Sequence, residues 1–285
     1  MDLGQTDGSH AARSHARACS LTRRLMGGAG SASVLMYRPQ PAIALEFVAH
    51  GITAHGQFVI ATCPNDQSPL ARVDVSQPAD VRVEILRETP DLELRVLASS
   101  VHMLGTLRWM NPVEADQMRR LGLLPATIAD LFEGADVLVG IVETERVLLY
   151  ADGGVTPIPY RTLLAEGIGF GASVFPRPEE ELDCHTLVAG VSACLLSSVC
   201  RAVIDGRVPG AVCSRSPVVT NCEHLGHRMV CTDVDRLGMT LLHVNSEEAV
   251  TVFAEFEEPV TDLAHLRASV SRLVESSVSA RQPRI

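Results

Sequence analysis

The sequence contains no lysine, and all 24 of its basic residues are arginine. Without lysine, the chain cannot form a Schiff base through a side-chain amine or use a lysine nucleophile. The 34 acidic residues outnumber the arginines and give a formal net charge of -10. Because no basic stripe is interleaved with aromatic side chains, we do not expect nucleic acid as a partner.

Aromatic residues make up only 4% of the sequence, and no apolar run approaches the roughly 20 residues that span a bilayer. The first 24 residues lack the apolar core of a secretory signal. We therefore expect a cytoplasmic protein with no membrane contact, whose eight cysteines stay reduced. The apolar fraction of 46% still allows a core, built mainly from Val, Leu, Ile and Ala.

A chain of 285 residues is typical of two domains. Its polar first residues predict a disordered tail over 1–15. We assign a barrel domain to 16–166, a linker rich in Gly and Pro to 167–178, and a C-terminal domain to 179–285. The predicted fold class is therefore α+β.

Short strands separated by turns and short helices characterise the first domain. This pattern suits a closed or nearly closed antiparallel barrel, because closure hides the strand edges. Val81, Val83 and Ile85 alternate onto one face, and Gly105 marks a bend in a long strand. The expected strands are 31–37, 45–53, 57–62, 81–86, 92–109, 137–142 and 146–150, and the expected helices are 16–26, 112–121 and 126–132.

The second domain follows the order αβββα. A helix over 179–204 precedes a loop over 205–217. Thr261 is the expected N-cap of a final helix that runs to Ala280. The three strands expected between the helices are 228–234, 239–244 and 249–256.

Two stretches resemble known families. The residues from Cys231 to Leu241 and from Val252 to Asp262 resemble the small C-terminal domain of HugZ-type haem-utilisation proteins. The residues from Val83 to Trp109 resemble strands of the flavin-binding split-barrel superfamily, which includes the pyridoxamine phosphate oxidases. The resemblance implies a six-stranded split β-barrel, usually dimeric, with FMN, a deazaflavin or haem near the subunit interface.

Histidine is the natural neutral ligand of haem iron, so we consider the ten histidines as candidates. The nearest match to the family's Asn-x-Asp-His motif ends at His185, near the expected start of a helix, which favours a neutral ring. His50 and His102 lie on expected strands and are further candidates. For His102, a half-buried ring held by hydrogen bonds is the competing interpretation.

An anionic cofactor also needs cations and an apolar wall. Arginine forks bind carboxylate and phosphate, and Arg95 and Arg108 are the candidates, although solvated strand arginines look the same in a sequence. Phe170 and Phe175 are candidates for the wall.

The spacing Cys222-x-His224-x2-His227-x3-Cys231 is the most metal-like in the chain, but it does not match a Cys-x2-Cys zinc knuckle. We therefore predict neither a zinc site nor disulfides. No Gly-x-Ser-x-Gly nucleophile motif is present.

Taken together, the residues and the resemblance predict a homodimeric haem-binding protein of haem-iron utilisation. Whether it also degrades haem is left open by the sequence. The alternatives are an FMN- or deazaflavin-dependent oxidoreductase and a dimeric binding or regulatory protein without a cofactor.

Overall fold

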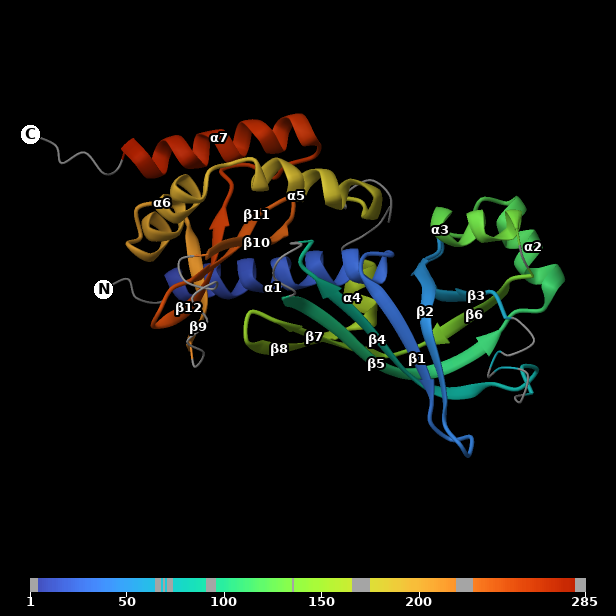
Figure 1. Ribbon diagram of the computed structural model, residues 1–285. Helices are drawn as coiled ribbons and strands as arrows, with labels where there is room; N and C mark the ends of the chain where they lie inside the picture. Colours follow the sequence, from blue (N-terminus) through green and yellow to red (C-terminus); the bar gives the residue numbers. More distant parts are fainter. Residues whose placement is uncertain are drawn as a thin grey trace, which may run out of the picture. The chain divides into compact units, whose positions relative to one another are not determined.

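The computed structural model describes residues 5–64, 68, 70, 74–90, 96–134, 136–165, 175–218 and 228–279. The chain divides into two compact units. The first consists of Met1–Arg87, Ser99–Ala151 and Val155–Val174, and the second consists of the remaining residues. Each unit has its own sheet and its own hydrophobic core (Figure 1).

The first unit is built on a sheet that closes on itself. Six strands follow the order β4-β1-β2-β3-β6-β5, and β4 also pairs with β5, so the ring is complete. Strands β7 and β8 extend the sheet from β5. The predicted α+β fold with an N-terminal β-barrel is thereby confirmed. The strands are β1 Ser31–Met36, β2 Ile43–Ile52, β3 Phe58–Thr62, β4 Ala79–Glu88, β5 Leu97–Trp109, β6 Leu138–Glu143, β7 Arg146–Ala151 and β8 Gly154–Pro159.

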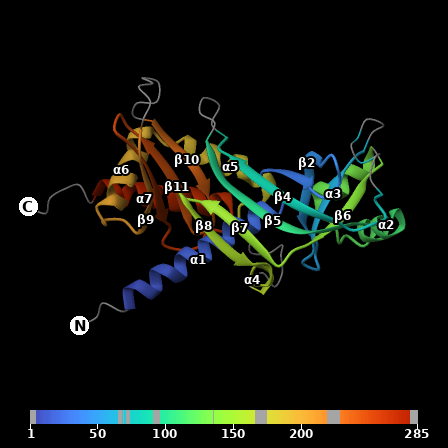
Figure 2. The ribbon, with the colours of Figure 1, turned by 90° about the horizontal axis from the view of Figure 1, so that it is seen from below.

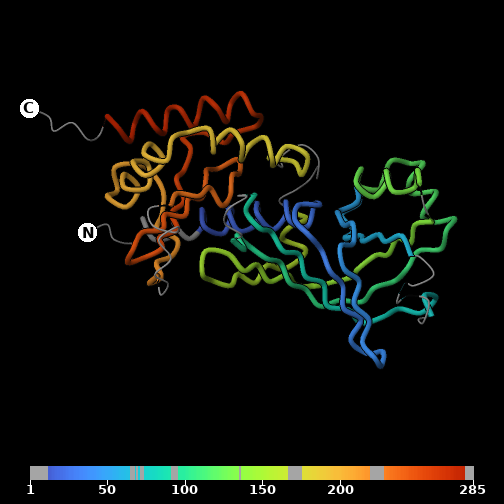
Figure 3. Tube along the Cα trace, in the orientation of Figure 1, coloured from blue at the N-terminus to red at the C-terminus, as the bar shows by residue number. Residues whose placement is uncertain are grey.

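Alternation along the strands fills the barrel with aliphatic side chains. Val81, Val83 and Ile85 of β4 are all completely buried, as their spacing predicts, while Arg82 and Glu84 point outward. The hairpin at 37–42 joins β1 to β2 (Figure 3).

The long strand β5 changes partner at Gly105. It pairs with β7 over Ser99–Met103 and with β6 over Thr106–Trp109. A Cβ atom at position 105 would collide with the carbonyl oxygen of Glu143. Glycine therefore permits a close approach of the two backbones where β5 changes partner, and the bend predicted here stays a prediction.

Helix α1 begins at Gln5, so it extends into the segment predicted to be disordered. Its residues Cys19, Leu25 and Met26 are fully buried and belong to the barrel core. Strand β8 was not predicted, because prolines at 157 and 159 argue against a strand. It lies at the end of the sheet, where proline is tolerated. The helices of this unit are α1 Gln5–Met26, α2 Pro112–Arg120, α3 Ala126–Ala129, η2 Asp130–Glu133 and α4 Tyr160–Ala165.

The second unit packs helices against a four-stranded antiparallel sheet of order β10-β11-β12-β9. The order of elements is ααββββα, not the predicted αβββα. The elements are η3 Pro178–Glu180, α5 Glu181–Ala189, α6 Ala193–Ile204, β9 Gly210–Pro217, β10 Arg228–Val234, β11 Gly238–Val244, β12 Glu248–Glu255 and α7 Leu263–Ser279.

Two corrections account for the difference. The single helix predicted over 179–204 is broken, because Gly190 follows the last residue of α5 and Ser192 caps α6 by accepting a hydrogen bond from the N–H of Leu195 at 3.4 Å. The predicted loop at 205–217 contains β9, an edge strand that pairs with β12. Its largely exposed residues show no apolar alternation, which is why the sequence gives no strand signal.

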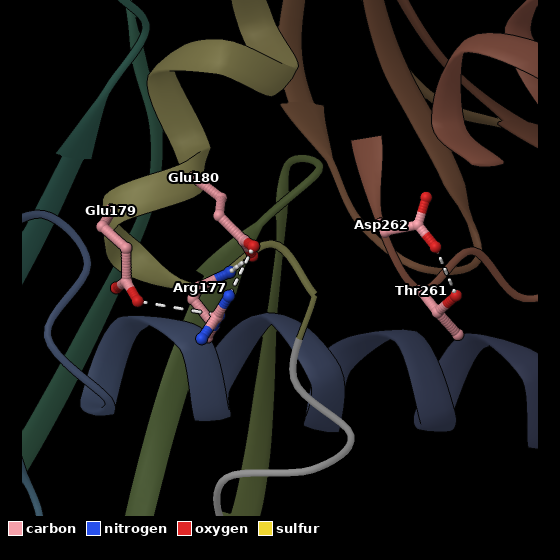
Figure 4. Close-up of polar contacts among 5 residues, drawn as sticks. All are labelled: Arg177, Glu179, Glu180, Thr261 and Asp262. Atoms are coloured by element: carbon pink, nitrogen blue, oxygen red, sulfur yellow. Dashed lines mark hydrogen bonds and ion pairs between the residues drawn. The ribbon is translucent and has the colours of Figure 1, made fainter. Parts of the chain in front are cut away.

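Local polar contacts lie at the starts of two helical segments of this unit, η3 and α7 (Figure 4). Arg177 binds Glu180 through Nη2–Oε1 at 2.8 Å, and its backbone N–H donates to the same carboxylate at 3.0 Å. At the start of α7, Asp262 Oδ1 accepts a hydrogen bond from the N–H of His265 at 2.8 Å. The N-cap is therefore Asp262 and not the predicted Thr261, whose hydroxyl donates to the Asp262 carboxylate.

Candidate functional site

A groove of about 860 Å³ lies on the outside of the barrel. Its walls come from β4, β5 and β7, which lie side by side in the sheet (Figure 2), and from the residues that flank β1 and β6. The lining residues are Tyr37, Asp80, Arg82, His102, Met103, Leu104, Gly105, Thr106, Glu143, Thr144, Glu145, Arg146, Leu148 and Tyr150.

Strand alternation places the side chains of this groove. In β5, Val101 and Met103 are buried in the barrel core, so His102 between them points outward. His102 is directly opposite Leu148 of β7. Tyr150 follows on the same face of β7, at a position that is 40% exposed.

His102 is held on three sides. Its Nδ1 lies 3.4 Å from Glu84 Oε1, and its Nε2 lies 3.0 Å from Ser100 Oγ. The Tyr150 ring meets the imidazole edge-on, with the centroids 4.7 Å apart. Because a carboxylate only accepts, the neutral ring carries its proton on Nδ1, and Nε2 accepts from the Ser100 hydroxyl. The imidazole is therefore held in a defined orientation, with Nε2 engaged by the Ser100 hydroxyl.

Both cations and apolar surface are available in the groove. Arg82 and Arg146 line it, and the side chain of Arg82 is 51% exposed and only 3.7 Å from Glu84. Tyr37 and Leu104 are 45% and 64% exposed. Such exposed apolar side chains around a polar centre are typical of a surface that binds a ligand or a partner.

His50 and Arg108, which the sequence also singles out, lie outside this groove. His50 is buried, and its Nε2–H donates to the carbonyl of Leu25 at 2.8 Å. Desolvation by burial lowers the pKa of His50, although backbone hydrogen bonds oppose the shift. Arg108 forms two hydrogen bonds of 3.1 Å with the carboxylate of Glu114, and this pairing raises its pKa.

The remaining candidates that the structure describes, His185 and Phe175, belong to the second unit. His185 lies in α5 of the second unit and is only 6% exposed. Phe175 is buried in the core of the same unit. Arg95 and Phe170 lie outside the described residues. Of the four predicted cofactor-binding residues that the structure describes, the groove contains His102 alone.

Sequence reasoning missed most partners of His102. Alternation along β4 places Arg82 and Glu84 on the outer face, and this signal was available. That β4 and β7 flank β5 is decided by the barrel closure, so the approach of Glu84 and Tyr150 to His102 had no local signal.

Within the described residues, no group of three or more His, Cys, Asp and Glu side chains is arranged to hold a metal. Cys222, His224 and His227 lie outside those residues, so the prediction of no zinc site stays a prediction. In the described part of the chain, no single helix is long and apolar enough to cross a membrane. Two consecutive helical segments, Pro178–Ala189 and Ala193–Ile204, together have the length and apolar composition of a membrane span, but they are bent by 95° at the break between them.

No protein-family model matches the chain, and no curated protein matches it. Among solved structures, a heme binding protein from Mycobacterium smegmatis is 17% identical, with a TM-score of 0.52, and the match covers 92% of this chain and 98% of that one. This likeness shows a shared fold.

Two further solved structures are less similar. A protein of unknown function from Agrobacterium tumefaciens is 14% identical over 90% of this chain and 94% of that one, with a TM-score of 0.37. A pyridoxinephosphate oxidase family protein from Clostridium acetobutylicum is 8% identical over 47% of this chain and 89% of that one, with a TM-score of 0.32. At such TM-scores, neither likeness bears on the fold.

Proposed function

We propose that this protein binds haem in the groove on the outside of the barrel, with His102 as the axial ligand of the iron. The observation that carries the proposal is that one groove combines an oriented imidazole, two guanidinium groups and exposed aromatic and aliphatic side chains. Haem needs the same three things, because it is an apolar plane with a central iron and two carboxylates.

The donor set around His102 fits a ligand to iron. Metal-ligating histidines usually donate their second ring N–H to a carboxylate, which fixes the tautomer and raises the basicity of the ligating nitrogen. Glu84 occupies this place beside Nδ1. Nε2 is then the ligating atom, and it would exchange the hydrogen bond from Ser100 for the iron.

The charges of the groove orient the proposed ligand. Asp80, Glu143 and Glu145 also line it and would repel the two propionates. The propionates are therefore expected to face Arg82 and Arg146, whose planar forks suit carboxylates. Tyr37 and Leu104 would cover the apolar face of the macrocycle.

Two similarities support the proposal. The fold is shared with the heme binding protein from Mycobacterium smegmatis. The C-terminal residues resemble those of HugZ-type haem-utilisation proteins, and we propose haem-iron utilisation as the cellular role on that ground.

His185 is the second candidate for the iron ligand. Its ring is buried, so ligation there would require α5 to move, whereas His102 already faces an open groove. Substitution of each histidine in turn separates the two assignments.

The test is a titration of the full chain with hemin, followed by the Soret band and by thermal unfolding. Haem at about 100 times its dissociation constant should stabilise the protein by roughly 2.7 kcal/mol. His102→Ala should shift the Soret band and weaken binding. Glu84→Gln should weaken binding less, by roughly 10- to 100-fold, as expected for a residue that orients a ligand.

The matched control is His55→Ala, because His55 is an exposed histidine of the same unit that does not line the groove. A normal spectrum and affinity in His102→Ala, together with their loss in His185→Ala, would move the ligand to His185. If the wild-type protein leaves the hemin spectrum unchanged and gains no stability, haem binding is wrong. The same titration with FMN then tests the flavin alternative.

A further inference from the structure

The second unit contains a cluster of sulfur and imidazole side chains next to helix α6, and none of them lines the barrel groove. Met229 of β10 and His243 of β11 are direct cross-strand partners. Both are half-buried, and both line a cavity of about 570 Å³. The other lining residues are Ala193, Cys194, Ser197, Arg201, Asn245, Ser246 and Glu247.

A third soft donor touches the cluster from the helix. The Sγ atom of Cys200 in α6 lies 3.8 Å from the Sδ atom of Met229. Two sulfur ligands that are each about 2.3 Å from one tetrahedral metal ion are themselves separated by about 3.8 Å. The two sulfurs are therefore already spaced as ligands of a common ion.

His243 stands beside Met229 on the sheet and borders the same cavity. Directly opposed residues of antiparallel strands have Cβ atoms roughly 4.5 to 5.5 Å apart. The side chains of Met229 and His243 consequently start from neighbouring points on the sheet and both border the cavity. The cavity gives a metal ion a path to Met229 and His243, and Cys200 is buried in contact with Met229.

We propose that Cys200, Met229 and His243 form a site for Cu(I). Thiolate and thioether ligands select Cu(I), whereas Mg²⁺, Ca²⁺ and Mn²⁺ prefer oxygen ligands. A thioether is also absent from the usual ligand set of zinc. The cluster thus differs from the zinc sites that groups of His, Cys, Asp and Glu build.

Binding involves no redox step. The S–H bond of Cys200 breaks as the bond between sulfur and copper forms, and the proton passes to solvent. Copper enters and stays as Cu(I), so neither an oxidant nor a reductant is consumed.

The experiment is an anaerobic competition between the haem-free full chain and bathocuproine disulfonate for Cu(I). The wild-type protein should withdraw one copper ion per chain from the chelator. Met229→Leu keeps every thiol and conserves side-chain volume, so the fold should tolerate it. Because loss of a group that only supports a ligand costs roughly 10- to 100-fold in metal affinity, loss of this ligand should cost at least about tenfold.

Met118→Leu is the matched control, since Met118 is a half-buried methionine of the barrel unit. Its affinity for Cu(I) should equal that of the wild type. Equal affinities of Met229→Leu and the wild-type protein would overturn the proposal, because the copper would then be held by other thiols. X-ray absorption of the copper-loaded protein should show mixed sulfur and nitrogen ligands, and a spectrum with sulfur alone would exclude His243.

Discussion

Two histidines on barrel strands have opposite environments, and this difference decides what each can do. The ring of His50 lies inside and donates to a backbone carbonyl, so it is part of the folded core. The ring of His102 lies outside, between a carboxylate and a hydroxyl, beside an open groove. Only the second can exchange a hydrogen bond for a ligand without opening the barrel.

At the residue scale, His50 should make the protein less stable in mild acid. Its pKa in the folded state is lowered below the ordinary value of 6.5, mainly by desolvation. Below about pH 6.5 the unfolded chain binds a proton that the folded chain resists, so the free energy of unfolding falls as the pH goes down towards the lowered pKa. The slope can reach about 1.4 kcal/mol per pH unit. Urea unfolding at pH 7, 6 and 5 measures it.

His50→Gln is the variant for this measurement, because an amide can still donate to the carbonyl of Leu25 but does not titrate. We expect it to be less stable than the wild type at pH 7 and to have a smaller loss of stability between pH 7 and pH 5. Equal losses in the two proteins would show that other groups cause the acid sensitivity.

At the element scale, the start of α7 shows how one side chain fixes a helix boundary. The carboxylate of Asp262 accepts a hydrogen bond from the N–H of His265, three residues later in the chain. The same hydrogen bond is the main cause of the lowered pKa of Asp262. The Thr261 hydroxyl donates a hydrogen bond to that carboxylate. Figure 4 shows the two residues side by side.

Asp262→Ala should therefore destabilise the protein, whereas Thr261→Ala should change little. Loss of an N-cap leaves a backbone donor of the first helical turn without its partner. We expect a drop in melting temperature of roughly 2 to 4 °C for Asp262→Ala, measured by calorimetry at neutral pH. A larger drop in Thr261→Ala than in Asp262→Ala would reverse the assignment of the cap.

At the scale of the whole molecule, the outer face of the barrel carries apolar side chains that the single chain leaves exposed. Tyr37, Leu104 and Tyr150 are 45%, 64% and 40% exposed around the groove. The homodimer that the family resemblance implies would use this face, and a stable interface of this kind buries about 2,000 Å² or more.

Leu104→Arg should dissociate that dimer, because it places a charge in the centre of an apolar contact. Light scattering at micromolar concentration should give a dimer for the wild-type protein and a monomer for the variant. Val113→Arg is the control, since Val113 is 77% exposed on α2 and lies outside the groove. A monomeric wild-type protein would contradict the predicted dimer.

Local signals failed where the chain departs from regular patterns. Strand β8 was not predicted because it contains prolines, and the edge strand β9 was not predicted because its residues are largely polar and exposed. The break between α5 and α6 has a local cause in Gly190 and Ser192, but the apolar run through this region suggested one helix.

The sequence alone determined the α+β class and the barrel strands, because alternation is a property of neighbouring residues. Tertiary structure decided which histidine faces a groove. Glu84, His102 and Tyr150 are far apart along the chain, and they meet because β5 pairs with both β4 and β7. Cys200 and Met229 likewise meet only where α6 covers the sheet, because long-range packing sets which side chains face one another.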